Sequence, residues 1–300
     1  MTFQRGLLCA AALAITASAV CVATKANDGA YQATIQKWRQ DREARLKSDD
    51  GWLTVSGLFW LHEGENRFGS GPLNDIVLPA GTAPPDAGAF VFHSGRTIAQ
   101  VKPGVPATIN GKRIESAELR PDTPDRLVLG GVALLVHASG SRYSIRMKDK
   151  GSALRKNFKG LRWFPVDESY RVTARFVPYQ PPKKALIQNI MGDVTEINVP
   201  GYAVFSLRGK ELHLDAEEAD ADGVSFVFRD LTSGRETYGA ARFLDTPPPQ
   251  GDKVVLDFNM AYNPPCAYNP YTTCPLPTPE NRLRVRIAAG EMAYRHSGGL

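Results

Sequence analysis

The densest group of residues capable of chemistry lies between Asp257 and Glu291 near the C-terminal end of the chain. Two carboxylates held in one cleft can divide general-acid and general-base work, so these two are our candidate catalytic residues. Amide and phenol groups in the same segment can orient a polar substrate. The candidate ligand contacts from this segment are Asn259, Tyr262, Asn263 and Asn281.

Prolines interrupt this segment, which we call the polar loop (residues 257–291). Because proline lacks an N–H group and fixes φ, it disfavours a helix or a central strand here. The polar loop is therefore expected to be stiff, and a stiff loop holds polar groups in fixed directions. The alternative is a closing loop whose asparagines and tyrosines satisfy its own backbone. The prolines are Pro264, Pro265, Pro270, Pro275, Pro277 and Pro279.

The hairpin before the polar loop adds two more candidate ligand contacts. Residues 228–244 read FRDLTSGRETYGAARFL, with a turn at Thr232-Ser233-Gly234. A strand following the turn would place Tyr238 and Arg242 on one face, where they line a cavity with Asp257 if the strands are neighbours. The alternative is ordinary cross-strand pairing.

The N-terminal residues have the pattern of a secretory signal. Arg5 precedes an uncharged, Ala-rich run over residues 6–24, and small residues follow as cleavage sites. We expect residues 1–26 to be removed on export to a periplasm, the alternative being a retained membrane anchor. No later run approaches membrane-spanning length, so no stable span is expected after cleavage.

Export determines how the cysteines are interpreted. Two of the four lie in the signal, which leaves Cys266 and Cys274 as a pair in an oxidising compartment. We expect them to form a disulfide. The alternative is a thiol nucleophile or a metal ligand.

Charge and motifs argue against several functions. The net charge is +5, and the basic residues are scattered, whereas a nucleic-acid binder has a basic stripe. No G-x-S-x-G, Walker A, H-E-x-x-H or C-x-x-C motif occurs. Five isolated histidines predict no metal centre, and we expect no cofactor. An acidic run over residues 215–222 leads into D-x-D-G at 220–223, but a solvated hairpin tip is favoured over a Ca²⁺ site because a distal Glu is missing.

The elements that must position these residues are mainly β. We expect an amphipathic helix in residues 27–50, capped by Asn27-Asp28, and then a β-sandwich in residues 51–150. Asn110-Gly111 between two apolar runs predicts a tight hairpin. Residues 151–300 contain about nine short runs with period-two alternation, which predict a second antiparallel sandwich or an open barrel. The proline-rich YQPPKK (residues 179–184) is expected to form a turn.

The first half resembles a forkhead-associated (FHA) domain. The landmarks are GENRFGS at 64–70, NDIVLP at 74–79, NGKRI at 110–114 and LVLG at 127–130. The resemblance implies a small β-sandwich. FHA domains bind phosphothreonine through an Arg after the first Gly, but Ser70 occupies that position here. Without its guanidinium group the phosphopeptide function is not expected.

The mature chain as a whole resembles a bacterial domain-of-unknown-function family, number 1684. The matching residues are 52–60, 68–79, TYG at 237–239 with RFL at 242–244, and the polar loop ending at AGE (289–291). The resemblance implies a layout and no established activity. We therefore expect an exported protein that binds a small polar ligand, or an envelope protein, through its polar loop. The alternative is a cell-envelope hydrolase with Asp257 and Glu291 as acid and base.

Overall fold

A computed structural model describes residues 13–121 and 123–295, with the backbone alone for residues 13–28. The chain divides into two units, Met1–Arg42 and Glu43–Leu300. Residues 1–12 of the predicted signal lie outside the described residues, so the signal stays a prediction. None of the helices in the described part of the chain combines the length and the apolar character of a membrane span.

Helix α1 (Leu13–Lys47) ends inside the predicted helical segment, residues 27–50. It runs through Asn27-Asp28 without a break, so these residues do not cap it as expected. In the second unit, the last turn of α1 packs its Leu46 against Leu53 and Tyr268.

Two sheets packed face to face follow the helix. Their strand orders are β1-β11-β10-β9-β6-β7 and β3-β2-β4-β5-β8, and one core cluster draws side chains from both. At the predicted tight turn, Asn110 and Gly111 have φ values of 50° and 76°, and Ile109 pairs with Lys112. The strands are β1 (Val55–Trp60), β2 (Gly64–Gly69), β3 (Ile76–Val77), β4 (Gly88–His93), β5 (Arg96–Val101), β6 (Ala107–Ile109), β7 (Lys112–Arg113), β8 (Ser116–Leu119), β9 (Leu127–Leu129), β10 (Val132–Ser139) and β11 (Arg142–Asp149).

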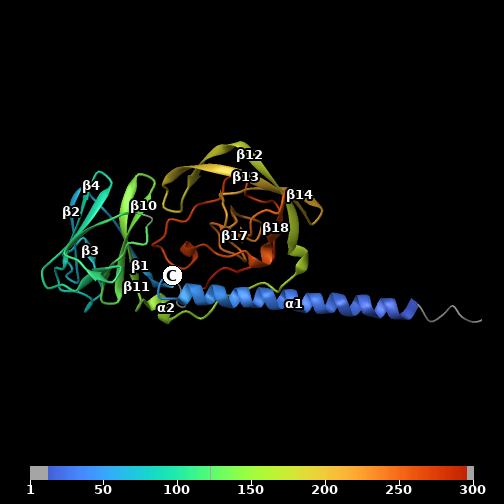
Figure 1. Ribbon diagram of the computed structural model, residues 1–300, viewed down its shortest axis with the longest axis horizontal. Helices are drawn as coiled ribbons and strands as arrows, with labels where there is room; N and C mark the ends of the chain where they lie inside the picture. Colours follow the sequence, from blue (N-terminus) through green and yellow to red (C-terminus); the bar gives the residue numbers. More distant parts are fainter. Residues whose placement is uncertain (1–12, 122, 296–300) are drawn as a thin grey trace, which may run out of the picture. The chain divides into compact units, whose positions relative to one another are not determined.

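The C-terminal half contains two further antiparallel sheets, ordered β14-β13-β12-β18 and β15-β16-β17. Apolar side chains of both sheets share a core with residues 283–289 of the polar loop. Figure 1 shows the orange-to-red polar loop running among β12, β13, β17 and β18. The mainly β fold with several open antiparallel sheets is thereby confirmed. The elements are α2 (Ala153–Lys156), β12 (Arg171–Gln188), β13 (Val194–Leu207), β14 (Lys210–Asp215), β15 (Glu218–Ala219), β16 (Val224–Phe228), β17 (Arg242–Thr246) and β18 (Lys253–Asp257). Single 3₁₀ turns lie at η1 (Trp52–Thr54), η2 (Glu168–Tyr170), η3 (Phe258–Met260) and η4 (Pro265–Ala267).

Two local predictions are wrong. The YQPPKK sequence forms no chain-reversing turn, because β12 continues through it and skips pairing with β13 between Pro178 and Lys183. Prolines have no N–H for the ladder, and a shift in register accommodates them. The strand expected from Thr237 begins only at Arg242, so Tyr238 lies in a turn region.

Beyond that shift, β12 and β13 extend as a two-stranded ribbon, which we call the hairpin arm (residues 183–199). Its tip is held by β10 and β11 of the first half. Arg142 donates to both carboxylate oxygens of Asp193 at 2.7 and 2.8 Å, and the Ser139 hydroxyl donates at 2.8 Å. Hydrogen bonds from Arg142, above all, lower the pKa of Asp193 to about 2.

Replacing the anchoring carboxylate should therefore loosen the tip of the hairpin arm. In Asp193→Asn the bidentate pair is lost, and we expect faster limited proteolysis within residues 189–194 than in the wild type. The control is Glu196→Gln, which removes an exposed ion pair with Lys184 on the same arm. Equal cleavage rates in the three proteins would contradict an anchoring role.

Candidate functional site

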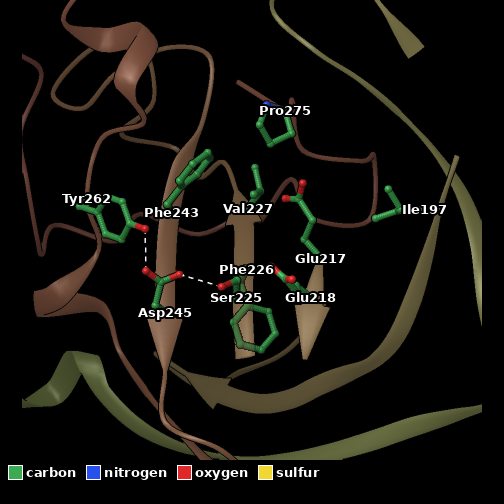
Figure 2. Close-up of a pocket in the computed structure, with 10 residues that line it drawn as sticks. All are labelled: Ile197, Glu217, Glu218, Ser225, Phe226, Val227, Phe243, Asp245, Tyr262 and Pro275. Carbon is green, nitrogen blue, oxygen red and sulfur yellow. Dashed lines mark hydrogen bonds between the residues drawn. The ribbon is translucent and has the colours of Figure 1, made fainter. Parts of the chain in front are cut away.

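A pocket of about 540 Å³ opens on one face of the β15-β16-β17 sheet (Figure 2). Cavities of this size commonly hold small molecules. We call it the acidic pocket, because three of its lining residues carry carboxylates. The lining residues are Ile197, Glu217, Glu218, Ser225, Phe226, Val227, Phe243, Asp245, Tyr262 and Pro275.

One row of polar side chains crosses the sheet at the pocket. Ser225 of β16 pairs with Glu218 of β15 on one side and with Asp245 of β17 on the other. Directly paired residues of antiparallel strands point to the same face, so the three side chains form a continuous row. Asp245 accepts hydrogen bonds from Ser225 at 2.9 Å and from the Tyr262 hydroxyl at 2.6 Å. These two donors fix the direction of the Asp245 carboxylate (Figure 2).

A second row is apolar, and it lies two residues after Ser225 on β16 and two residues before Asp245 on β17. Val227 pairs with Phe243, and Phe243 forms a β-bridge to Tyr262 of the polar loop. The rings of Phe243 and Tyr262 meet edge to face, with centroids 5.8 Å apart. Strand alternation sends the intervening Phe226 and Leu244 to the opposite face, where they join the buried core. The sheet therefore has a core face and a pocket face.

Glu217 gives the pocket a group that titrates near neutrality. It precedes β15 and is held there by its backbone N–H, which donates to the Ser225 carbonyl at 2.9 Å. Burial, and then the like charge of Glu218, raise the pKa of Glu217 to about 7. Groups with such pKa values are enriched at functional sites because they exchange protons at physiological pH.

The hairpin arm contributes to one side wall of the acidic pocket, next to Glu217 (Figure 2). Its Ile197 lines the acidic pocket, and the arm is joined to the polar loop by a bridge between Asn189 and Pro275. A small recess of about 10 Å³ continues the pocket past Ile197 and Glu217 toward Asp215. The pocket thus depends on an arm that the first half of the molecule anchors.

Tyr262 is the one sequence-predicted site residue among the described residues that line the acidic pocket. The other seven lie elsewhere. Asp257 is 8% exposed and Glu291 is fully buried, so both proposed acid–base carboxylates are enclosed by protein.

Asp257 and Asn259 brace a neighbouring segment. The Asp257 carboxylate accepts the backbone N–H of Asn259 at 3.1 Å and its side-chain amide at 3.2 Å. Asn259 in turn exchanges hydrogen bonds with the backbone of Asp167 at 3.0 and 2.9 Å. Arg171 of the paired strand lies 3.7 Å from Asp257. These contacts close the start of the polar loop onto the segment before β12.

Glu291 and Asn263 form a second buried group. The Asn263 amide donates to Glu291 at 2.8 Å and to the Met292 carbonyl at 2.8 Å. The Tyr268 hydroxyl donates to the same carboxylate. The two ends of the polar loop are thereby joined through the Glu291 side chain.

Arg242 lies in the interior, where its guanidinium group has no exposed surface. It donates to Asp230 at 3.4 Å and to the carbonyl of Ile287 at 3.0 Å, and it also donates to the carbonyl of Ala289. Burial lowers the pKa of Arg242, and the Asp230 charge opposes that shift. Asp230 also accepts the Ile287 N–H at 2.6 Å.

Tyr238 and Asn281 likewise hold backbone. The Tyr238 hydroxyl donates to the Cys266 carbonyl at 3.2 Å. Asn281 is 5% exposed, accepts the Asp215 N–H, and donates to the carbonyls of Asp215 and Val227, each at 2.8 Å. The strands β17 and β18 belong to different sheets, so Tyr238, Arg242 and Asp257 do not share a sheet face.

Cys266 and Cys274 are free cysteines, and they lie in contact. The Cys266 N–H donates to Sγ of Cys274 at 3.2 Å. A hydrogen bond between the thiols lowers the pKa of Cys274 and raises that of Cys266.

Sequence reasoning missed Glu217 and Asp245 as site residues. Glu217 belongs to the acidic run that we expected to form a solvated hairpin tip. Asp220 and Asp222 do form an exposed turn there, in which Asp220 accepts the Asp222 N–H at 2.7 Å. The available signal was the alternation of polar and apolar residues before β15. It could not be used, because the sequence does not show which strands lie beside that segment. Within residues 13–121 and 123–295, no group of three or more His, Cys, Asp or Glu side chains is arranged to hold a metal ion.

Residues 156–292 match the model of a family described as "Protein of unknown function (DUF1684)". The resemblance seen in the sequence is confirmed for that region, which contains every lining residue of the acidic pocket. The FHA-like first half lies outside it and stays a prediction.

Among solved structures, an uncharacterized protein of Haloarcula marismortui, determined in solution by NMR, is 33% identical to this chain. The alignment covers 46% of this chain and 78% of that one, with a TM-score of 0.39. Among the curated proteins, none matches the chain.

The raised pKa of Glu217 predicts a particular dependence of stability on pH. Its folded-state pKa of about 7 exceeds the ordinary value of 4.5, so its contribution to the folded state is fully present below pH 4.5 and is lost as the pH rises from there to about 7. Glu217→Gln should match the wild type near about pH 4 and be about 1–3 kcal/mol more stable near about pH 8. Urea unfolding at both pH values measures this. A pH-independent difference would contradict the assignment.

Arg242 should contribute to stability rather than to ligand contact. Arg242→Met leaves Asp230 buried without its cation, and we expect a loss of about 3–5 kcal/mol in the free energy of unfolding. Arg286→Met is the control, because its ion pair with Glu236 is exposed and should contribute about 0–1 kcal/mol. Similar small effects of the two substitutions, measured by urea unfolding, would exclude the structural role.

Proposed function

We propose that this protein binds a small polar ligand in the acidic pocket. The observation that carries the proposal is the composition of the cavity. Three carboxylates and two hydroxyl groups lie beside aromatic and aliphatic walls, and none of the described lining residues is Lys, Arg or His. Apolar walls supply the favourable burial of a ligand, and a few fixed polar groups determine its orientation.

The charge of the pocket selects among ligand classes. Carboxylates at Glu217, Glu218 and Asp245 repel an anion, and no nearby cation offsets that repulsion within the lining. Phosphate-bearing and carboxylate-bearing ligands are therefore disfavoured. Molecules that carry hydroxyl or ammonium groups can donate hydrogen bonds to the carboxylates.

The polar loop takes part through its outer edge. It contributes Tyr262 and Pro275 to the pocket, while its carboxylates Asp257 and Glu291 hold the loop from inside. A ligand site on this loop is therefore best supported where Tyr262 meets the β15-β16-β17 sheet.

A cell-envelope hydrolase is the second candidate, and one observation favours it. General acid–base catalysis works best with a pKa near the operating pH, and the Glu217 carboxyl has such a pKa. Glu217 also borders open space, whereas Asp257 and Glu291 are buried. Turnover that Glu217→Gln abolishes would support this candidate over simple binding.

We also propose that the mature chain is exported to a periplasm and that Cys266 and Cys274 join as a disulfide there. The signal-like N-terminal residues and the contact between the two thiols support this. A free-thiol count on protein purified from that compartment tests it, and two reactive thiols would contradict it.

A thermal-shift screen of residues 27–300 tests the binding proposal. The panel contains sugars, amines, metals, nucleotides and organic acids. A ligand present at a hundred times its dissociation constant stabilises the folded state by about 2.7 kcal/mol, which raises the melting temperature measurably. We expect hits among the sugars or amines.

The variants locate the site. Asp245→Asn should abolish a genuine hit, because it removes the carboxylate that Ser225 and Tyr262 orient. Tyr271→Phe is the control, since Tyr271 lies in the polar loop, is 38% exposed, and is not among the pocket-lining residues. Hits that persist in Asp245→Asn would place binding elsewhere.

A further inference from the structure

The negative charge of the acidic pocket is not balanced from within. Carboxylates elsewhere in the same half hold basic partners, as Asp215 does with Lys183 at 2.9 Å and Glu236 does with Arg286 at 2.6 Å. Glu217, Glu218 and Asp245 instead share one cavity whose described lining has no basic side chain. Collecting like charges around one cavity costs free energy, and a bound cation removes that cost.

The walls of the pocket suit a cation that has an apolar part. Phe243 and Tyr262 present aromatic rings, whose faces attract ammonium and guanidinium groups. Val227, Ile197 and Pro275 add aliphatic surface. A volume of about 540 Å³ accommodates an organic molecule together with its charged group.

We propose that the acidic pocket takes a small organic cation, an amine or a guanidine with an apolar body. Its charge lies over Ser225, between Glu217 and Asp245, and its apolar part lies against Phe243 and Tyr262. This inference rests on the proposed binding function and names the ligand class. Neutral polyols and anions are the competing classes that the experiment separates.

Cation binding should be coupled to the protonation of Glu217. The charged groups around Glu217 are Glu218 and Asp245 in the pocket and Asp215 in the adjoining recess. Asp215 is already paired with Lys183 and, at 2.7 Å, with His213. A cation beside Glu217 favours its ionised form, so binding releases a proton when the pH lies below about 7. Affinity should therefore rise with pH and then level off.

Three probes of the same shape test the ligand class: benzylammonium, benzyl alcohol and benzoate. Each is titrated into residues 27–300 by calorimetry, near pH 6 and near pH 8. We expect benzylammonium to bind about tenfold more tightly near pH 8, since the ionised fraction of Glu217 changes by about that factor. Benzyl alcohol should bind more weakly and without pH dependence, and benzoate should not bind.

Variants assign the pH dependence to its source. Glu217→Gln should abolish the pH dependence and weaken benzylammonium binding. Glu218→Gln removes the like charge that raises the pKa of Glu217, so the midpoint of the pH dependence should move to lower pH. Glu211→Gln, an exposed substitution on β14 away from the pocket lining, is the matched control and should change nothing. Circular dichroism confirms that each variant is folded.

The outcomes separate this inference from the proposed function. Benzyl alcohol or a sugar binding as tightly as benzylammonium, with loss in Asp245→Asn, would keep the polar-ligand function and overturn the cation. Absence of benzylammonium binding would also overturn the cation. Absence of any Asp245-dependent ligand in the thermal-shift panel would overturn both.

Discussion

The guanidinium group of Arg242 is enclosed by protein at the first residue of β17, and the surrounding chain is arranged to neutralise it. Asp230 supplies the opposite charge, and the carbonyls of Ile287 and Ala289 accept further hydrogen bonds. An unpaired charge in the interior costs several kcal/mol, so these segments must stay together. Strand alternation then directs the next residue, Phe243, to the opposite face. The buried ion pair and the pocket wall are thus two sides of one strand.

The polar loop is also held together by buried polar groups that find partners within the protein. A loop that passes through a core must satisfy its backbone groups without water, and side-chain amides and carboxylates do this. Asn281 makes three such bonds, and Glu291 joins Asn263 and Tyr268. The residue types that support catalysis are also those that satisfy buried backbone. Burial and hydrogen-bond partners distinguish the two roles.

The acidic pocket lies outside these buried hydrogen-bonded groups. Its floor is the outer face of a sheet whose inner face is filled, and its wall is the hairpin arm. The arm keeps its position because Arg142 and Ser139 of the first half hold Asp193. The first half therefore helps to hold one wall of the acidic pocket, although the family match covers only residues 156–292. This anchoring gives the first half a role in positioning the hairpin arm.

Local sequence determined much of the fold. Period-two alternation predicted the β architecture, because it depends only on which face of a strand is buried. The Asn110-Gly111 turn was predicted because few residues tolerate positive φ. Prolines correctly excluded long regular elements from the polar loop, where only the short turns η3 and η4 occur. These features depend on neighbours a few residues apart.

Tertiary structure decided the rest. Where the sequence predicted short strands, β12 and β13 are long, because their pairing continues on both sides of the prolines. Glu217 and Asp245 became pocket residues because β16 lies between their segments and aligns their side chains. Asp257, Glu291 and Arg242 became buried because segments distant in sequence close over them. The sequence shows which residues can ionise or donate, but their pKa values and access depend on contacts that form only when distant segments pack together.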